Sequence, residues 1–114
     1  FGDLVTMRWW DDLWLNESFA TYVSNLALVE ATRFEAAWRA FHADMKRWGY
    51  QADARTTTHP ISGVVPDTDA TFYNFDGITY GKGASVIKQL VAEMVASDRN
   101  AVVYEDWRHD RSAG

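Results

Sequence analysis

The chain lacks several features that would define its class at once. Among its 114 residues there is no cysteine, which excludes disulfides and thiolate zinc sites but fits reducing and oxidising compartments alike. There is no run of lysine or arginine, and the net charge is −5, which argues against a nucleic acid partner. No apolar stretch approaches the roughly 20 residues of a membrane span. We therefore expect neither a nucleic acid partner nor a membrane span, and we expect a cytoplasmic location.

Aromatic residues, by contrast, are abundant. Six Trp, five Tyr and six Phe are a heavy load for a chain of this length, which can bury only about two-thirds of its unfolded surface. Trp9, Trp10 and Trp14 in particular are difficult to cover without neighbouring elements. Because exposed aromatic surface invites association, we expect this chain to be a piece of a larger protein.

Helical periodicity dominates the sequence and predicts a mainly α fold, with about three helices and a long connecting loop. The first helix is expected from about Leu13 to Ala31, capped by Asp11 or Asp12. Apolar side chains occupy nearly its whole circumference, and such helices are normally buried. We therefore expect this helix to be enclosed by other elements.

The remaining elements follow from capping and breaking residues. Thr32 and Glu35 form a capping box for a second helix, and Gly49 is placed to end it. Residues 50–69 contain both prolines, Gly63 and several Thr and Asp residues, which predicts a loop. A third helix is expected from about Tyr80 to Ala96.

Glu17 is the most informative single residue of the first helix. Burying its carboxylate without a partner would cost several kcal/mol, so it needs a proton, an Arg or Lys partner, or a metal ion. Helix geometry alone favours a paired or hydrogen-bonded structural acid over a metal ligand. The residues that share the face of Glu17 are uncharged: Leu13, Trp14, Ala20, Thr21, Ser24 and Leu28.

Two segments change that balance: Phe-Gly-Asp-Leu-Val-Thr at residues 1–6 and Trp-Leu-Asn-Glu-Ser-Phe-Ala at residues 14–20. Together they resemble the zinc aminopeptidases of the aminopeptidase N family. In that family an H-E-x-x-H helix supplies two zinc ligands and a general base, and a glutamate further along the chain is the third ligand. Glu17 matches this glutamate. The resemblance implies that the matching histidines precede Phe1, so that the chain begins just after the motif.

A second match lies at residues 74–85, Asn-Phe-Asp-Gly-Ile-Thr-Tyr-Gly-Lys-Gly-Ala-Ser. It is similar to the family segment whose tyrosine faces the zinc across the substrate, and that tyrosine is Tyr80 here. A phenol near its reference pKa of about 10 is a neutral donor, suited to an oxyanion. Without the motif, Tyr80 would be an ordinary tyrosine packed at a helix start. Residues 58–61, Thr-His-Pro-Ile, match a family loop between these segments.

Four further residues are candidates for support of the site. Asn16, Asp3 and Thr21 could orient the ligand from an outer shell, whereas Lys82 is expected to be structural.

The three histidines are not expected to bind zinc. His42, His59 and His109 are far apart in the sequence, and neither His42 nor His59 lies one helical turn from another ligand type. We expect His59 to shape its loop before Pro60 instead.

The resemblance implies a partial thermolysin-like (gluzincin) catalytic domain over residues 1–96, followed by a divergent or truncated tail, residues 97–114. One zinc ion would be held by Glu17 and two upstream histidines, and the substrates would be peptides with a free N-terminus. The chain alone would be inactive. The alternative is a noncatalytic helical interaction module with a degenerate metal site, in which Glu17 is a structural acid.

Overall fold

The computed structural model describes residues 1–97. Within this range the chain is mainly helical and has no strand, which confirms the predicted mainly α fold. None of the helices between residues 1 and 97 is long and apolar enough to cross a membrane. His109 and, apart from Ser97, the predicted tail lie outside the described residues.

The first helix, α1, spans Leu13–Ala31 as predicted and follows a short 3-10 turn, η1, at Trp10–Asp12. The predicted cap is wrong, because Asp12 makes no side-chain capping bond. The Asp11 carboxylate is used elsewhere, as the acceptor for the backbone N–H of Val65 at 2.8 Å.

The expected burial of the whole α1 circumference is also wrong. No residue from Leu13 to Tyr22 is exposed, whereas Val23 and Leu28, further along the helix, are exposed. The described residues therefore enclose the first half of α1 and leave one side of its second half open.

The second helix is continuous through α2 (Ala37–Phe41), a π-helical stretch η2 (His42–Lys46) and α3 (Arg47–Asp53). The predicted capping box is wrong. The Thr32 hydroxyl donates to the carbonyl of Leu28 and accepts from the backbone N–H of Phe34 at 3.1 Å, so it ends α1 rather than starting α2.

The prediction that Gly49 ends the second helix is wrong, because Gly49 lies buried inside α3. A Cβ at this position would lie 2.9 Å from the backbone nitrogen of Lys82 and 3.2 Å from the carbonyl oxygen of Gly77. The glycine therefore serves a close approach between two helices, which the local sequence does not reveal.

The predicted loop is shorter than expected at both ends. Helix α3 continues to Asp53, and an additional helix, α4, spans Thr68–Tyr73. The Asp67 carboxylate caps α4 by accepting from the backbone N–H of Ala70 at 2.7 Å. The third predicted helix begins at Ile78 with a π-helical stretch, η3 (Ile78–Lys82), and continues as α5 (Gly83–Ala96).

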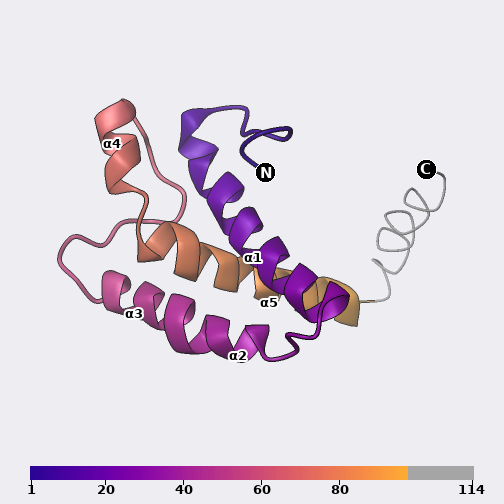
Figure 1. Ribbon diagram of the computed structural model, residues 1–114. Helices are drawn as coiled ribbons and strands as arrows, with labels where there is room; N and C mark the ends of the chain where they lie inside the picture. The colour runs from indigo at the N-terminus through magenta and orange to yellow at the C-terminus, as the bar shows by residue number, and fades with distance from the viewer. Residues whose placement is uncertain (98–114) are drawn as a thin grey trace.

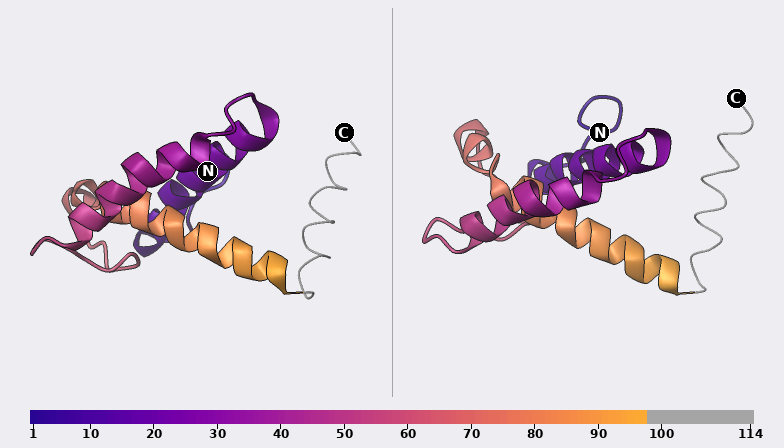
Figure 2. Two further views of the ribbon diagram at one scale, coloured as in Figure 1. Left: turned by 90° about the horizontal axis from the view of Figure 1, so that it is seen from below. Right: turned by 60° about the horizontal axis from the view of Figure 1, so that its bottom comes forward.

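Three long segments make the core: α1, the helix α2–α3, and the helix η3–α5 (Figure 1). Helix α1 packs against α2 and α5, and α3 packs against η3. The two further views show α5 and the α2–α3 helix diverging from their closest approach (Figure 2). The core cluster consists of Tyr22, Phe41, Ala84 and Ile87, with half-buried Trp14, Phe19, Leu26, Trp38, Met45 and Val91 packed against it.

Two glycines allow this close packing near the start of η3–α5. A Cβ at Gly81 would collide with the carbonyl oxygen of Met45, and one at Gly83 would collide with the hydroxyl of Ser18. The fully buried Ser18 hydroxyl also donates to the carbonyl oxygen of Thr79 at 2.7 Å. The glycines therefore serve helix packing.

Candidate functional site

Glu17 and Tyr80, the two principal residues predicted from the sequence, meet in the structure. Glu17 lies in the second turn of α1 and Tyr80 in η3. Burial and, next, the negative charge of the nearby Glu17 carboxylate raise the pKa of Tyr80 to about 12. The phenol was expected to titrate near 10. Since the shift is upward, Tyr80 remains a neutral hydrogen-bond donor throughout the neutral pH range.

The ring of Tyr80 is held by two other aromatic rings. Trp48, from α3, stacks on it with centroids 6.1 Å apart and an angle of 12° between the planes. Phe75 stacks on it as well, with centroids 6.3 Å apart. The sequence analysis missed both contacts, because neither position stands at a helical spacing from Tyr80. These contacts restrict the directions in which the phenol can point.

A hollow of about 550 Å³ opens beside Glu17. Trp9 and Trp10 line this hollow and are 66% and 50% exposed, respectively. These rings are therefore not covered within the described residues. Trp14, by contrast, is half-buried at the edge of the core. The hollow is lined by Gly2, Thr6, Met7, Arg8, Trp9, Trp10, Leu13, Asn16 and Glu17.

Three of the four predicted supporting residues form contacts that do not involve the Glu17 carboxylate. Asn16 donates its side-chain amide to the sulfur of Met7 at 2.7 Å. The Thr21 hydroxyl donates to the backbone carbonyl of Glu17 at 2.9 Å, not to its carboxylate. Asp3 lies exposed in the N-terminal segment.

Lys82 forms an exposed ion pair with Asp53 at 2.9 Å. Hydrogen bonds from Lys82 and then from Thr58 hold the pKa of the Asp53 carboxyl below its usual value. This pair ties η3 to the end of α3, so Lys82 has a structural contact, as expected.

The residues present fit a zinc ion only in part. Within residues 1–97, Glu17 has no ion pair with a lysine, arginine or histidine, and its carboxylate oxygen is a suitable zinc donor. However, no three His, Cys, Asp or Glu side chains in this range gather closely enough to hold a metal ion. A catalytic zinc needs three protein ligands. The described part of the chain could therefore supply one ligand of a set that other residues complete.

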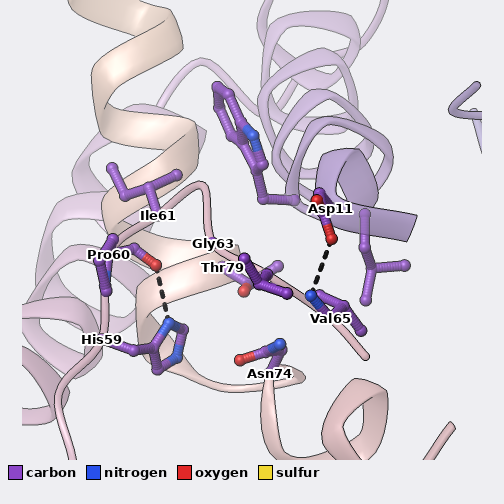
Figure 3. Close-up of a pocket in the computed structure, with 11 residues that line it drawn as sticks. Asp11, His59, Pro60, Ile61, Gly63, Val65, Asn74 and Thr79 are labelled. Atoms are coloured by element: carbon purple, nitrogen blue, oxygen red, sulfur yellow. Dashed lines mark hydrogen bonds between the residues drawn. The ribbon is translucent and has the colours of Figure 1, made fainter. Parts of the chain in front are cut away.

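A second cavity, of about 220 Å³, lies between the loop after α3 and the starts of α1 and η3 (Figure 3). On one side of it, His59 contacts the carbonyl oxygen of Pro60 through Nδ1 at 2.8 Å and the carboxylate of Asp76 through Nε2 at 2.7 Å. The expectation that His59 shapes its loop is confirmed. No local pattern in the sequence connects Asp76 with His59, so this contact was not predicted.

The comparisons with known proteins define the family. The chain matches the Peptidase family M1 domain over residues 1–103. It belongs to this peptidase family, which confirms the resemblance stated from residues 1–6, 14–20 and 74–85.

Named relatives are close in sequence but much longer. The chain is 54% identical to an aminopeptidase N of Streptomyces lividans over 94 residues, which are 81% of this chain and 11% of that protein. It is 44% identical to a leucyl aminopeptidase of Saccharolobus solfataricus over 81% of this chain and 12% of that protein. A tricorn protease-interacting factor F2 of Thermoplasma acidophilum is 46% identical over 79% of this chain and 12% of its own length. The chain thus spans about a tenth of the length of these relatives, and its division at residue 96 stays a prediction.

Proposed function

We propose that this chain is part of a zinc-dependent aminopeptidase that removes N-terminal residues from peptides. The observation that carries the proposal is the meeting of Glu17 and Tyr80, which come from two separate family-like segments and lie close enough for the charge of Glu17 to raise the pKa of Tyr80. The names of the relatives support an aminopeptidase rather than another peptidase. We also propose that the protein is cytoplasmic and that this chain alone is inactive.

Glu17 would hold the zinc ion through its carboxylate. When bound in such a site, zinc polarises the scissile carbonyl and lowers the pKa of a water molecule. Two histidine ligands and a general base would come from residues outside this chain. The open hollow beside Glu17 gives those groups and a substrate access to the carboxylate.

Tyr80 would stabilise the negative charge that develops on the carbonyl oxygen of the substrate. Its raised pKa keeps the hydrogen on the phenol at neutral pH, and the stacked rings of Trp48 and Phe75 limit the motion of the phenol. A donor that is oriented before the reaction costs no reorganisation when the charge develops. Removing one such donor lowers kcat by about 100- to 1000-fold.

The test uses the longer protein that contains this chain, with Glu17→Gln and Tyr80→Phe as variants. Glu17→Gln should lose zinc, whereas Tyr80→Phe should keep one zinc per chain and lose about 100- to 1000-fold in kcat on an aminoacyl anilide. Tyr73→Phe is the matched control, because Tyr73 is 82% exposed. Normal turnover in Tyr80→Phe would remove Tyr80 from the mechanism. Absence of zinc in the unaltered protein would favour the noncatalytic interaction module.

A further inference from the structure

The loop between α3 and α4 forms contacts with the residues that precede α1 and η3, the helical segments that carry Glu17 and Tyr80. At one point His59 contacts Asp76, just before η3. At the other, the backbone N–H of Val65 donates to Asp11, just before α1. We call residues 59–65 the bridging loop. Figure 3 shows it passing along the cavity from His59 to Val65.

The two carboxylate oxygens of Asp76 have different partners. Oδ1 accepts from the backbone N–H groups of Ile78 at 3.0 Å and Thr79 at 3.2 Å. These donors belong to the first turn of the helix, where N–H groups have no partner inside the helix. Oδ2 is left for the Nε2 of His59 at 2.7 Å. Asp76 therefore caps the turn that contains Tyr80 while His59 holds Asp76.

Both ring nitrogens of His59 have a partner. Nδ1 lies 2.8 Å from the carbonyl oxygen of Pro60, and Nε2 lies 2.7 Å from the carboxylate of Asp76. The imidazole ring is therefore held from two sides.

We propose that His59 and Asp76 are positioning residues for Tyr80. The two side chains are 25% and 29% exposed, and ion pairs that water reaches add little stability. Their value is geometric, because they fix the first turn of η3 against the bridging loop and hence against the start of α1. The inference rests on the proposed role of Tyr80 as the oxyanion donor. A shift of about 1 Å in such a group can cost about 100-fold in rate.

Three variants of the full zinc-loaded protein separate the two contacts. Asp76→Ala removes the cap and the His59 contact, and kcat should fall about 100-fold. His59→Ala removes only the second contact, and kcat should fall about tenfold. Asp76→Asn keeps an oxygen for the cap and an amide that can donate to neutral Nε2, so kcat should stay within about threefold of the unaltered protein. In all three, KM and zinc content should be unchanged.

Hydrogen exchange gives a readout that does not depend on activity. The amides of Ile78 and Thr79 should exchange about tenfold faster in His59→Ala and faster still in Asp76→Ala, because the turn opens locally. His42→Ala and Asp44→Asn are matched controls, since both residues lie exposed on η2 and neither contacts η3 through a described hydrogen bond or ion pair. Their kcat and exchange rates should equal those of the unaltered protein.

The outcomes are decisive in both directions. The ordered loss of kcat, with Asp76→Asn close to normal and faster exchange at Ile78 and Thr79, supports the proposal. An unchanged kcat in His59→Ala overturns it, as does unchanged exchange, or an Asp76→Asn protein as impaired as Asp76→Ala. Full activity in Tyr80→Phe would instead overturn the proposed function, and that result is obtained independently of the His59 and Asp76 variants.

Discussion

The ring of Tyr80 is held by contacts from the rest of this chain, whereas the side of α1 that carries the Glu17 carboxylate opens onto a hollow. Asp76 caps η3, Trp48 and Phe75 stack on the Tyr80 ring, and Gly81 lies directly against the helix α2–α3. Helix α1, in contrast, begins without a side-chain cap.

The surroundings of Glu17 are correspondingly open. The hollow beside it is lined largely by residues 2–10, in which Trp9 and Trp10 expose half or more of their surface. Asn16 donates to the sulfur of Met7, which is a weak acceptor. The difference teaches that the described residues hold the Tyr80 phenol on several sides but leave the Glu17 carboxylate open to the hollow. Such an arrangement suits a ligand whose partners come from elsewhere.

The largest effect is expected from Gly81→Ala, which attacks the packing of the Tyr80 segment. The new Cβ would collide with the backbone carbonyl of Met45, which cannot turn away as a side chain could. We expect a loss of about 3 kcal/mol in the free energy of unfolding, measured by chemical denaturation. Gly63→Ala is the control, because no atom lies within 4 Å of a Cβ built there. A loss below about 1 kcal/mol would mean that the Tyr80 segment is no more fixed than α1.

Ser18→Ala should have the next largest effect, because Ser18 joins the two regions. It follows Glu17 in sequence, and its buried hydroxyl bonds to the carbonyl of Thr79, which precedes Tyr80. Removing the donor leaves a buried oxygen without this bond and should cost about 2 kcal/mol. Ser24→Ala, at an exposed serine of the same helix, should change stability by less than about 0.5 kcal/mol. Equal losses in the two variants would show that the Ser18 bond does not join the regions.

The sequence predicted the fold best where local signals and packing agree. Helix α1 has the expected bounds, since its ends coincide with a turn before Leu13 and with Thr32 after Ala31. The sequence also identified Glu17 and Tyr80, but only through the two family-like segments. Helical periodicity alone favoured a structural role for Glu17.

The errors arise where a residue serves a distant contact. Gly49 reads locally as a helix end, yet it lies inside α3 because η3 passes against it. Asp11 reads as a helix cap, yet its carboxylate binds Val65 in the bridging loop. The His59–Asp76 pair joins residues that no local pattern connects. These choices are decided by tertiary packing, which a single sequence does not display.

Asp11→Ala should lower the free energy of unfolding by a smaller amount, because it removes the hydrogen bond between the bridging loop and the residue before α1. The backbone N–H of Val65 would lose its acceptor, at a cost of about 1 kcal/mol. The neighbouring Asp12→Ala is an unusually close control, because Asp12 makes no capping hydrogen bond at the same helix start. Urea denaturation of both variants measures the difference. If Asp12→Ala were the more damaging, α1 would be held by a cap after all and the contrast with η3 would weaken.

The smallest effect concerns the exposed Asp53–Lys82 pair on the outer side of the Tyr80 segment. Hydrogen bonds from Lys82 and Thr58 lower the pKa of Asp53 in the folded chain. Because the folded pKa lies below the unfolded value of about 3.9, the stabilisation is present above that pH and is lost as the pH falls through the folded pKa. Asp53→Asn should therefore be slightly less stable than the unaltered protein at about pH 6, and the difference should shrink on acidification. Denaturation curves at several pH values measure this. A difference that grows toward acid pH would show that the pair does not stabilise the folded state, and that the aromatic and capping contacts alone hold this segment.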